Sequence, residues 1–216
     1  RLGEHGLPLM GGGDWNDGMN EIGIEGQGES VWLAWFLYAV LDHFIPLARY
    51  KHDISFSDTL HAMKGALKDS IETSAWDGQW YLRAFYDDGT KLGSRENDEC
   101  MIDSISQSWS VLSQAGQRDR SRKAMDSAYK YLVMEEESVS LLLTPPFDKT
   151  EKDPGYIKEY YPGIRENGGQ YTHAAVWLAI AAAMQGDCKR AYKLFTMLNP
   201  INSSKDREAA LRYEKE

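Results

Sequence analysis

The chain has 216 residues, a formal net charge of −9 at pH 7, 42% hydrophobic residues and 26% charged residues. This length and composition are those of a globular domain with a substantial core, and they exclude disorder as the main state. The acidic balance argues against nucleic acid or an anionic membrane surface as the main partner.

The cysteine and hydropathy patterns indicate a reducing, aqueous environment. Cys100 and Cys188 have neither the spacing of a metal site nor that of a disulfide framework, which favours free thiols, with a single disulfide as the alternative. No apolar run approaches the roughly 20 residues of a membrane span. We expect a piece of a longer protein, because the chain opens at Arg1 without an initiator methionine.

The first feature in chain order is the segment 11–20, with the sequence GGGDWNDGMN. Its three leading glycines predict a tight loop. Two carboxylates, two carboxamides and the indole of Trp15 follow. Because an aromatic face packs against a pyranose while carboxylates and amides hold its hydroxyls, the loop predicts a sugar site. A glycine-rich connector with a half-buried tryptophan is the alternative.

Helical periodicity follows over residues 31–50 and 57–73. Ser30 is placed to cap the first helix, and the two helices are predicted to form an antiparallel hairpin. Residues 76–90 carry two Asp-Gly turn signals around an aromatic-rich run. That pattern predicts a short β-hairpin or an extended insert.

The second half of the chain repeats the alternation of helices and loops. Helices are predicted at 103–114, 118–134, 170–185 and 188–198, with a short apolar strand at 141–147. Residues 148–169 form a long loop with two prolines and four glycines, and loops of that length are usually functional. Paired helices with long loops on one side predict an all-α fold, part of an α/α toroid with strands confined to inserts.

A second group of polar residues, 165–173, leads from this long loop into a helix with the sequence RENGGQYTH. A helix N-terminus offers unpaired N–H groups that attract an anion. His173 lies in the first turn, where it could donate to a phosphate; a structural histidine is the alternative. For Glu166 the alternative is a capping or surface carboxylate.

A third group, 97–109, enters the helix predicted from residue 103. Asp103 and Gln107 lie on one face of it. We expect Asp103 to cap the helix, while Gln107 could equally bond a loop backbone. The sequence has no P-loop, dinucleotide fingerprint, HExxH pair or GxSxG elbow, so nucleotide, metal-hydrolase and serine-hydrolase chemistry have no support.

The glycine loop, together with the segment GESVW at 28–32, resembles the catalytic loop of glycoside hydrolase family 94. That family holds the inverting cellobiose-type phosphorylases and is also classified as glycosyltransferase family 36. Segments 145–149, 153–158, 165–177 and 198–202 resemble the branch with cyclic β-1,2-glucan synthases and 1,2-β-oligoglucan phosphorylases. The resemblance runs over nearly the whole chain.

The resemblance implies an (α/α)6 barrel, of which residues 1–216 would be a single partial catalytic domain. It implies that Asp17 is the general acid and that His173 contacts phosphate. The residues that it assigns to substrate binding are Asp14, Trp15, Arg165, Glu166 and Gln170. It implies no metal and no cofactor, with inorganic phosphate as co-substrate.

The implied reaction is phosphorolysis of a β-glucosidic bond, most simply in β-1,2-glucan, or its reverse, with α-glucose 1-phosphate as product. Inverting hydrolases need an acid and a base, but phosphate is already an anionic nucleophile, so one protonated carboxylic acid suffices. Asp17 must then hold a proton near neutrality, which burial or a nearby negative charge favours. The alternatives are a hydrolase, with Asp103 or Glu166 as base, and a non-catalytic carbohydrate-binding domain.

The implied partners are a β-glucan or β-glucooligosaccharide and phosphate, with no nucleic acid and no membrane contact by this segment. A homodimer would form through domains outside the chain. We expect a cytoplasmic location, also where the parent is a membrane-anchored synthase. Helices separated from their barrel neighbours should expose apolar faces.

Overall fold

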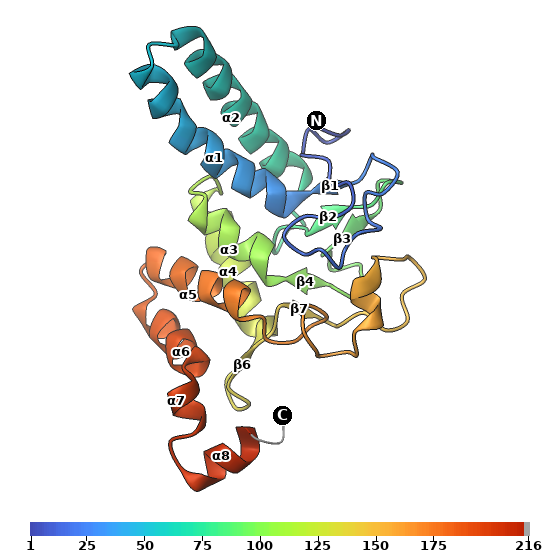
Figure 1. The fold of residues 1–216 in the computed structure, drawn as a ribbon, viewed down its shortest axis with the longest axis vertical. Coiled ribbons are helices and arrows are strands. Elements are labelled where there is room, and N and C mark those ends of the chain that lie inside the picture. Colours follow the sequence, from blue (N-terminus) through green and yellow to red (C-terminus); the bar gives the residue numbers. More distant parts are fainter. Residues whose placement is uncertain (214–216) are drawn as a thin grey trace.

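The computed structural model describes residues 1–213; residues 214–216, with which the predicted domain 1–216 ends, lie outside them. Three helical hairpins lie side by side (Figure 1). Within this part of the chain, α1 packs on α2 and α3, α3 on α4 and α5, and α5 on α6. The helix bounds are α1 Val31–Tyr50, α2 Ile54–Ser74, α3 Ser104–Leu112, α4 Arg118–Leu132, α5 Thr172–Met184, α6 Cys188–Leu198, α7 Pro200–Ser203 and α8 Arg207–Tyr213.

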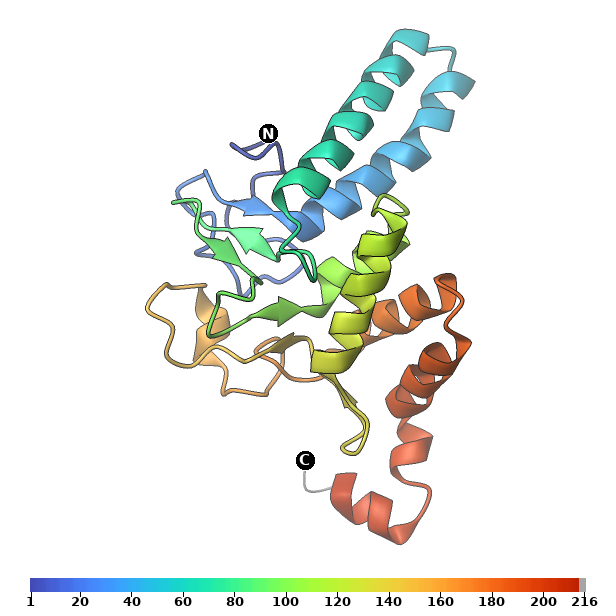
Figure 2. The same ribbon diagram turned by 180° about the vertical axis from the view of Figure 1, so that it is seen from behind.

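The predicted predominance of helix is confirmed, and the paired helices follow the predicted order. Closure of a ring of six hairpins is not shown by residues 1–213 and stays a prediction. Seen from both sides (Figures 1 and 2), α1, α3 and α5 all begin at the edge of the molecule where the loops gather. The loops that carry the predicted site therefore share one end of the helical stack.

Side-chain caps set the starts of several helices. The Ser30 hydroxyl accepts a hydrogen bond from Leu33 N, as predicted for α1. Helix α2 begins three residues before its predicted start because Asp53 accepts from Phe56 N and so satisfies an orphan donor there. Asp187 caps α6 in the same way.

The strands are short and antiparallel. The predicted insert at 76–90 contains β2, which pairs with β3 just beyond the predicted range and also with β1. The apolar strand predicted at 141–147 shortens to β7, which pairs with β4. The strand bounds are β1 Glu29–Ser30, β2 Ala84–Phe85, β3 Lys91–Leu92, β4 Ile102–Asp103, β5 Val133–Met134, β6 Val139–Ser140 and β7 Leu143–Thr144, and one 3-10 helix, η1, covers Tyr156–Glu159.

The core has two parts that matter for the site. The larger lies between the hairpins, where Trp35 and Ile71 are fully buried. A smaller cluster, with Met19, Phe147 and Ile157, lies beneath the loops. Because this second cluster takes one side chain from the glycine loop and two from segment 147–157, burying it holds the two loops together.

Apolar side chains are exposed along two helices, as expected for helices that lack neighbours. On α1 they are Phe36, Val40, Phe44 and Leu47, and on α5 they are Val176, Ile180 and Met184. Both sets recur at helical spacing, so each forms a continuous stripe.

Helix α1 corrects the expectation about apolar runs. By length and composition it could cross a membrane, with a mean hydropathy of 1.5 over an 18-residue window. A core helix of a folded domain passes the same test, and Trp32 and Trp35 of α1 are buried in this fold. The helix is therefore weak evidence for a membrane span.

Two glycines give a matched test of the fold. An added Cβ at Gly28 would lie 2.5 Å from Ile22 O, whereas at Gly65, inside α2, it would meet nothing within 4 Å. We expect Gly28→Ala to lower the free energy of unfolding by roughly 1–3 kcal/mol through overpacking. Gly65→Ala should raise it by about 0.5–1 kcal/mol. Urea denaturation of both variants checks this, and equal effects at the two positions would contradict it.

Candidate active site

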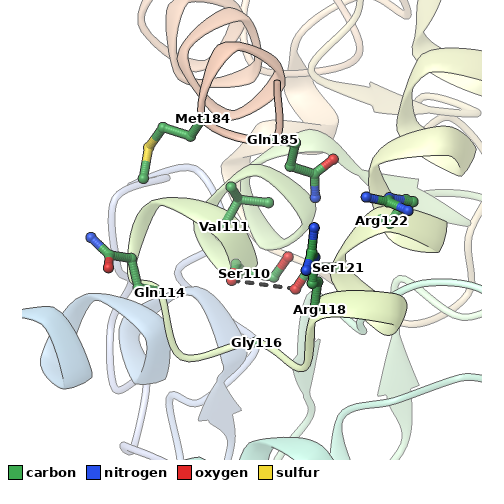
Figure 3. Close-up of a pocket in the computed structure, with 9 residues that line it drawn as sticks. All are labelled: Ser110, Val111, Gln114, Gly116, Arg118, Ser121, Arg122, Met184 and Gln185. Carbon is green, nitrogen blue, oxygen red and sulfur yellow. Dashed lines mark hydrogen bonds between the residues drawn. The ribbon is translucent and has the colours of Figure 1, made fainter. Parts of the chain in front are cut away.

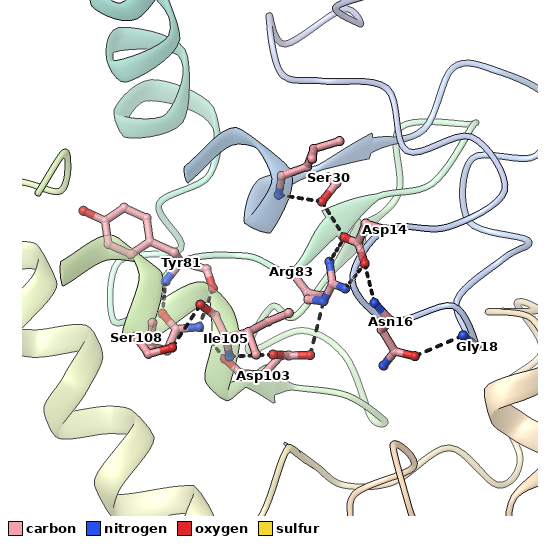
Figure 4. Close-up of polar contacts among 11 residues, drawn as sticks. Asp14, Asn16, Gly18, Ser30, Tyr81, Arg83, Asp103, Ile105 and Ser108 are labelled. Atoms are coloured by element: carbon pink, nitrogen blue, oxygen red, sulfur yellow. Dashed lines mark hydrogen bonds and ion pairs between the residues drawn. The ribbon is translucent and has the colours of Figure 1, made fainter. Parts of the chain in front are cut away.

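The glycine loop is fixed by the buried carboxylate of Asp14 (Figure 4). Arg83, one residue before β2, donates from Nη1 to Asp14 Oδ2 at 2.7 Å and from Nη2 to Asp14 Oδ1 at 2.6 Å. The Ser30 hydroxyl donates to Oδ2 at 2.6 Å, and Asn16 N donates to Oδ1 at 3.0 Å. The side chains of Asp14 and Arg83 are both 0% exposed. The loop is therefore attached to the fold by a desolvated, bidentate ion pair.

A second carboxylate approaches the same guanidinium. Asp103 Oδ2 lies 3.2 Å from Arg83 Nε, and Asp103 Oδ1 accepts from Ile105 N at 2.8 Å. The prediction that Asp103 caps a helix is confirmed for α3. We call Asp14, Arg83 and Asp103 the buried triad.

The two carboxyl groups of the triad have opposite pKa shifts. Burial would raise the pKa of the Asp14 carboxyl, but the charge and hydrogen bonds of Arg83, with those from Ser30 and Asn16, hold it below its usual value. Burial raises the pKa of the Asp103 carboxyl to about 6, because Arg83 only partly compensates for the lost solvent. The same guanidinium thus pairs closely with one carboxylate and loosely with the other.

The triad changes the roles suggested by the sequence. The side chain of Asp14 faces Arg83 and is shielded from solvent, so it holds the loop, and its role in substrate binding stays a prediction. Asp103 is 1% exposed, and its carboxyl faces Arg83 and the start of α3. Gln107 accepts from Tyr81 N and donates to Tyr81 O. This confirms the interpretation that Gln107 bonds a loop backbone.

Asp17 lies on the open side of the same loop. Asp17 is exposed, so burial, one of the two conditions expected to favour its protonated form, is not provided by the described residues. Partial desolvation raises the pKa of the Tyr156 phenol, and the neighbouring negative charges of Asp17 and Glu166 act in the same direction. Asp17 and Glu166, 149 positions apart in the printed numbering, thus both lie close enough for their charges to act on this phenol.

Close backbone packing joins the glycine loop to segment 153–157. Ile157 N donates to Gly18 O at 2.8 Å, and an added Cβ at Gly18 would lie 2.9 Å from Ile157 Cβ. Tyr156 N donates to Asn20 Oδ1 at 3.1 Å. A side chain at residue 18 would separate the two loops, so glycine is required next to Asp17.

Asn167 fixes the part of the long loop that carries the predicted sugar contacts. It is 0% exposed, accepts from Phe147 N at 2.7 Å and donates to Phe147 O and Tyr160 O, each at 2.8 Å. All three bonds are to backbone, so one buried amide sets the course of the loop directly after Glu166.

Arg165 and Glu166 lie next to this clamp. The Arg165 guanidinium stacks 4.7 Å from the centre of the Tyr160 ring, and its Nε lies 3.5 Å from Glu166 Oε2. That oxygen is buried without a hydrogen-bond partner among the described residues. This oxygen of Glu166 thus has hydrogen-bonding capacity that no described residue uses.

His173 is held by Trp15. Trp15 Nε1 donates to His173 Nδ1 at 3.2 Å, and the Trp15 ring packs against Tyr171 and Trp177, with centroids 5.1 and 5.4 Å away. Because Nδ1 accepts, the proton of the neutral ring is on Nε2, which is then a donor. No side chain of residues 1–213 caps the N-terminus of α5, where His173 lies, so that terminus also presents free N–H groups.

Gln170 has a different environment. Its Oε1 accepts from Ser140 N at 2.9 Å, and it lines a cavity of about 730 Å³ between the β5–β6 turn, α6 and the α7–α8 segment. The structure thus ties Gln170 to β6, and its role in substrate binding stays a prediction.

A cavity of about 340 Å³ lies between α3, α4 and the end of α5 (Figure 3). Its polar lining includes Arg118, Arg122 and Gln185, and no carboxylate lines it. Because it meets α5 at Met184, about 17 Å along the helix from His173, it is separate from the predicted site. Within the described chain, no group of three or more His, Cys, Asp or Glu could hold a metal ion.

Sequence reasoning missed Arg83 and Asn167. The only signal for Arg83 is a single charged residue within the run WYLRAF at 80–85, since a charge in an apolar strand needs a buried partner. Asn167 lies within the motif at 165–173, but no local pattern indicates that it bonds the backbone of Phe147, 20 residues away, and of Tyr160, 7 residues away. Both cysteines are free, Cys100 buried and Cys188 exposed.

The helical hairpins thus carry an exposed carboxyl group, an aromatic surface and an open helix N-terminus on the loops at one end. Comparison with known proteins is more specific. Residues 1–214 match the family model of the glycosyl hydrolase 94 superfamily catalytic domain, and the chain belongs to this family.

Curated relatives agree with that assignment. A cyclic β-(1,2)-glucan synthase, NdvB, of Rhizobium meliloti (strain 1021) is 50% identical over 216 residues, 100% of this chain and 8% of that protein. A solabiose phosphorylase of Paenibacillus borealis is 34% identical, and the alignment covers 94% of this chain and 26% of that protein. An N,N′-diacetylchitobiose phosphorylase of Vibrio furnissii is 34% identical, and the alignment covers 88% of this chain and 23% of that protein. The chain spans about a quarter of these phosphorylases and less of the synthase.

The pKa of Asp103 gives a test of the buried triad. A carboxyl whose folded pKa is raised to about 6 contributes stability that is present below its unfolded pKa and is lost as the pH rises through 6. Relative to Asp103→Asn, the wild type should lose up to about 3 kcal/mol of unfolding free energy between pH 4 and pH 7. Denaturant unfolding at several pH values measures this difference.

Asp14→Asn is the matched control for that titration, because the pKa of Asp14 is lowered in the fold. Its stabilising contribution is present above the unfolded pKa and is lost as the pH falls. The wild type should therefore gain on this variant as the pH rises. A pH-independent difference for Asp103→Asn would contradict the assigned shift.

Proposed function

We propose that this chain is part of the catalytic domain of an enzyme that phosphorolyses β-glucosidic bonds with inversion, or runs the reverse reaction. Its proposed substrate is β-1,2-glucan and its product α-glucose 1-phosphate, in a cyclic β-1,2-glucan synthase-like protein. The observation that carries the proposal is the exposed Asp17 carboxyl on the loop whose Trp15 bonds a histidine, and that histidine has a free ring nitrogen as a donor at an open helix N-terminus.

In the proposed step, Asp17 donates its proton to the leaving glycosidic oxygen as the bond from that oxygen to C1 breaks. A phosphate oxygen forms the new bond to C1 from the opposite face of the ring, which inverts the configuration. Phosphate supplies the negative charge that a hydrolase obtains from a carboxylate base. One acid, one anion and a positioned sugar are sufficient.

The start of α5 supports the phosphate part of the proposal. His173 Nε2–H and the free N–H groups of the first helical turn are donors, and the helix dipole favours an anion there. The indole of Trp15 keeps the histidine ring in the tautomer that donates outward. An acidic chain can thus bind phosphate locally.

The sugar part of the proposal is supported by Trp15, Arg165 and Glu166. The half-buried indole offers an apolar face, while the carboxylate of Glu166 and the exposed guanidinium of Arg165 offer acceptors and donors for hydroxyls. The β-1,2 linkage rests on the likeness to the glucan synthase. Other family relatives bear the names of different disaccharides.

Hydrolysis is a weaker proposal for this site. An inverting hydrolase needs a base about 6.5–9.5 Å from the acid with room for water between them. Asp103 is too buried to act as that base. Of the two candidate bases, only Glu166 remains. The free donors beside Trp15 favour an anionic nucleophile.

The proposed partners are a β-glucan or β-glucooligosaccharide and inorganic phosphate. We propose that the domain works on the cytoplasmic side, because cytoplasmic thiols are kept reduced and both cysteines are free.

Asp17→Asn tests the acid. We expect the full-length wild type to release α-glucose 1-phosphate from one of β-1,2-, β-1,3- or β-1,4-glucooligosaccharides only when phosphate is present. The variant should lose about 100- to 10,000-fold in kcat, since it cannot protonate the leaving oxygen. Asp148→Asn, at another exposed aspartate, is the control. Release from no linkage, with sugar binding intact, would overturn the proposal in favour of a binding domain.

Trp15→Phe tests the phosphate contact. The variant keeps an aromatic face but removes the donor to His173, so the imidazole is no longer held in one orientation. We expect the KM for phosphate to rise about five- to tenfold, the equivalent of one hydrogen bond, with a smaller change in kcat. Steady-state kinetics with phosphate varied measures this. Tyr171→Phe, in the same aromatic cluster, should leave the KM unchanged, and equal effects would contradict the role given to the indole.

A further inference from the structure

The buried triad is not used by any step of the proposed reaction. It places one cation and two carboxyl groups out of solvent, with side chains 0–1% exposed. Buried ion pairs contribute little net stability, because the desolvation of the charges offsets their attraction. A purely structural contact at this point could be apolar, so the triad calls for a role that needs fixed geometry.

The geometry of Arg83 is that of a clamp. All three of its nitrogens face a carboxylate oxygen: Nη1 and Nη2 bond the two oxygens of Asp14, and Nε faces Asp103. A bidentate fork fixes both the position of the Asp14 carboxylate and its rotation, which a single lysine ammonium cannot do.

The fixed carboxylate sets the course of the following residues. Asp14 Oδ1 accepts from Asn16 N at 3.0 Å, and Asn16 Oδ1 accepts in turn from Gly18 N at 3.1 Å. Asn16 O then accepts from Met19 N at 3.1 Å. Asn16, Gly18 and Met19 are buried, and only Asp17 between them is exposed. The direction in which Asp17 projects therefore follows from the orientation of Asp14.

The same clamp connects the loop to two helices. The Ser30 hydroxyl both donates to Asp14 and accepts from Leu33 N in the first turn of α1. Asp103 both faces Arg83 and caps α3. Through these caps the loop is held against the starts of two packed helices, which are more rigid supports than a loop.

We propose that Arg83 is the positioning residue for the general acid, acting through Asp14 to hold the carboxyl of Asp17 in line with the leaving oxygen. This inference rests on the proposed function. A residue that only stabilised the fold would affect all substrates alike. A residue that aims the acid affects only those whose leaving group needs a proton.

The test uses the full-length protein and two β-glucosides with phosphate. One is the β-glucooligosaccharide that the wild type cleaves, whose alkoxide leaving group needs protonation. The other is 2,4-dinitrophenyl β-glucoside, whose phenolate leaves without a proton. For Arg83→Lys we expect kcat to fall about 100-fold on the oligosaccharide, as a misplacement of about 1 Å can cause. Its KM should stay within about threefold and the loss on the aryl glucoside below about fivefold.

Three further variants make the result decisive. Asp17→Asn should show the same selectivity more strongly. Asp14→Asn, which keeps the shape of the side chain but loses its charge, should follow Arg83→Lys and replaces it if the lysine variant does not fold. Arg120→Lys is the matched control, because Arg120 pairs with Glu72 outside the site and its substitution should change neither activity.

Equal losses on the two substrates, or no loss on either, would overturn the positioning role and leave the proposed function intact. Absence of phosphate-dependent cleavage of both substrates by the wild type would overturn the proposed function and, with it, this inference.

Discussion

The interaction on which the rest of the structure depends is the contact of one buried guanidinium with two carboxyl groups. Arg83 brings the glycine loop, the segment before β2 and the start of α3 to a single point. None of the three side chains could be buried alone, because an unpaired charge is costly away from water. The helical stack and the loop end are therefore joined by a contact in which each charged group depends on the others.

Around that point, buried polar groups hold the exposed ones in place. Asp14 fixes the turn that presents Asp17, Asn167 fixes the loop that presents Glu166, and Trp15 fixes the ring of His173. In each case the first residue uses its hydrogen bonds within the protein, while the second keeps a polar group for a ligand. This division is what a preorganised site requires, since a free side chain on an unsupported loop would not keep its geometry.

Asp17 and the apolar stripes on α1 and α5 are all exposed in the described residues. The chain covers 8% to about a quarter of the relatives named above. Under the proposed function, an acid that keeps its proton near neutrality needs a drier environment than an open loop provides. Bound sugar and phosphate would supply part of that shielding, and phosphate would add a negative charge that favours the protonated form.

The sequence by itself determined the six longer helices, the caps of α1 and α3 and the loop that carries Asp17, because periodicity, capping residues and glycine clusters act over a few neighbouring positions. It also determined the family, through motifs long enough to be specific. Only the tertiary structure decided which of two nearby aspartates is buried. Asp14 and Asp17 have the same side chain, and the difference comes from Arg83, 69 residues away from Asp14 along the chain. Pairing between such distant segments depends on packing and desolvation, which leave almost no local pattern.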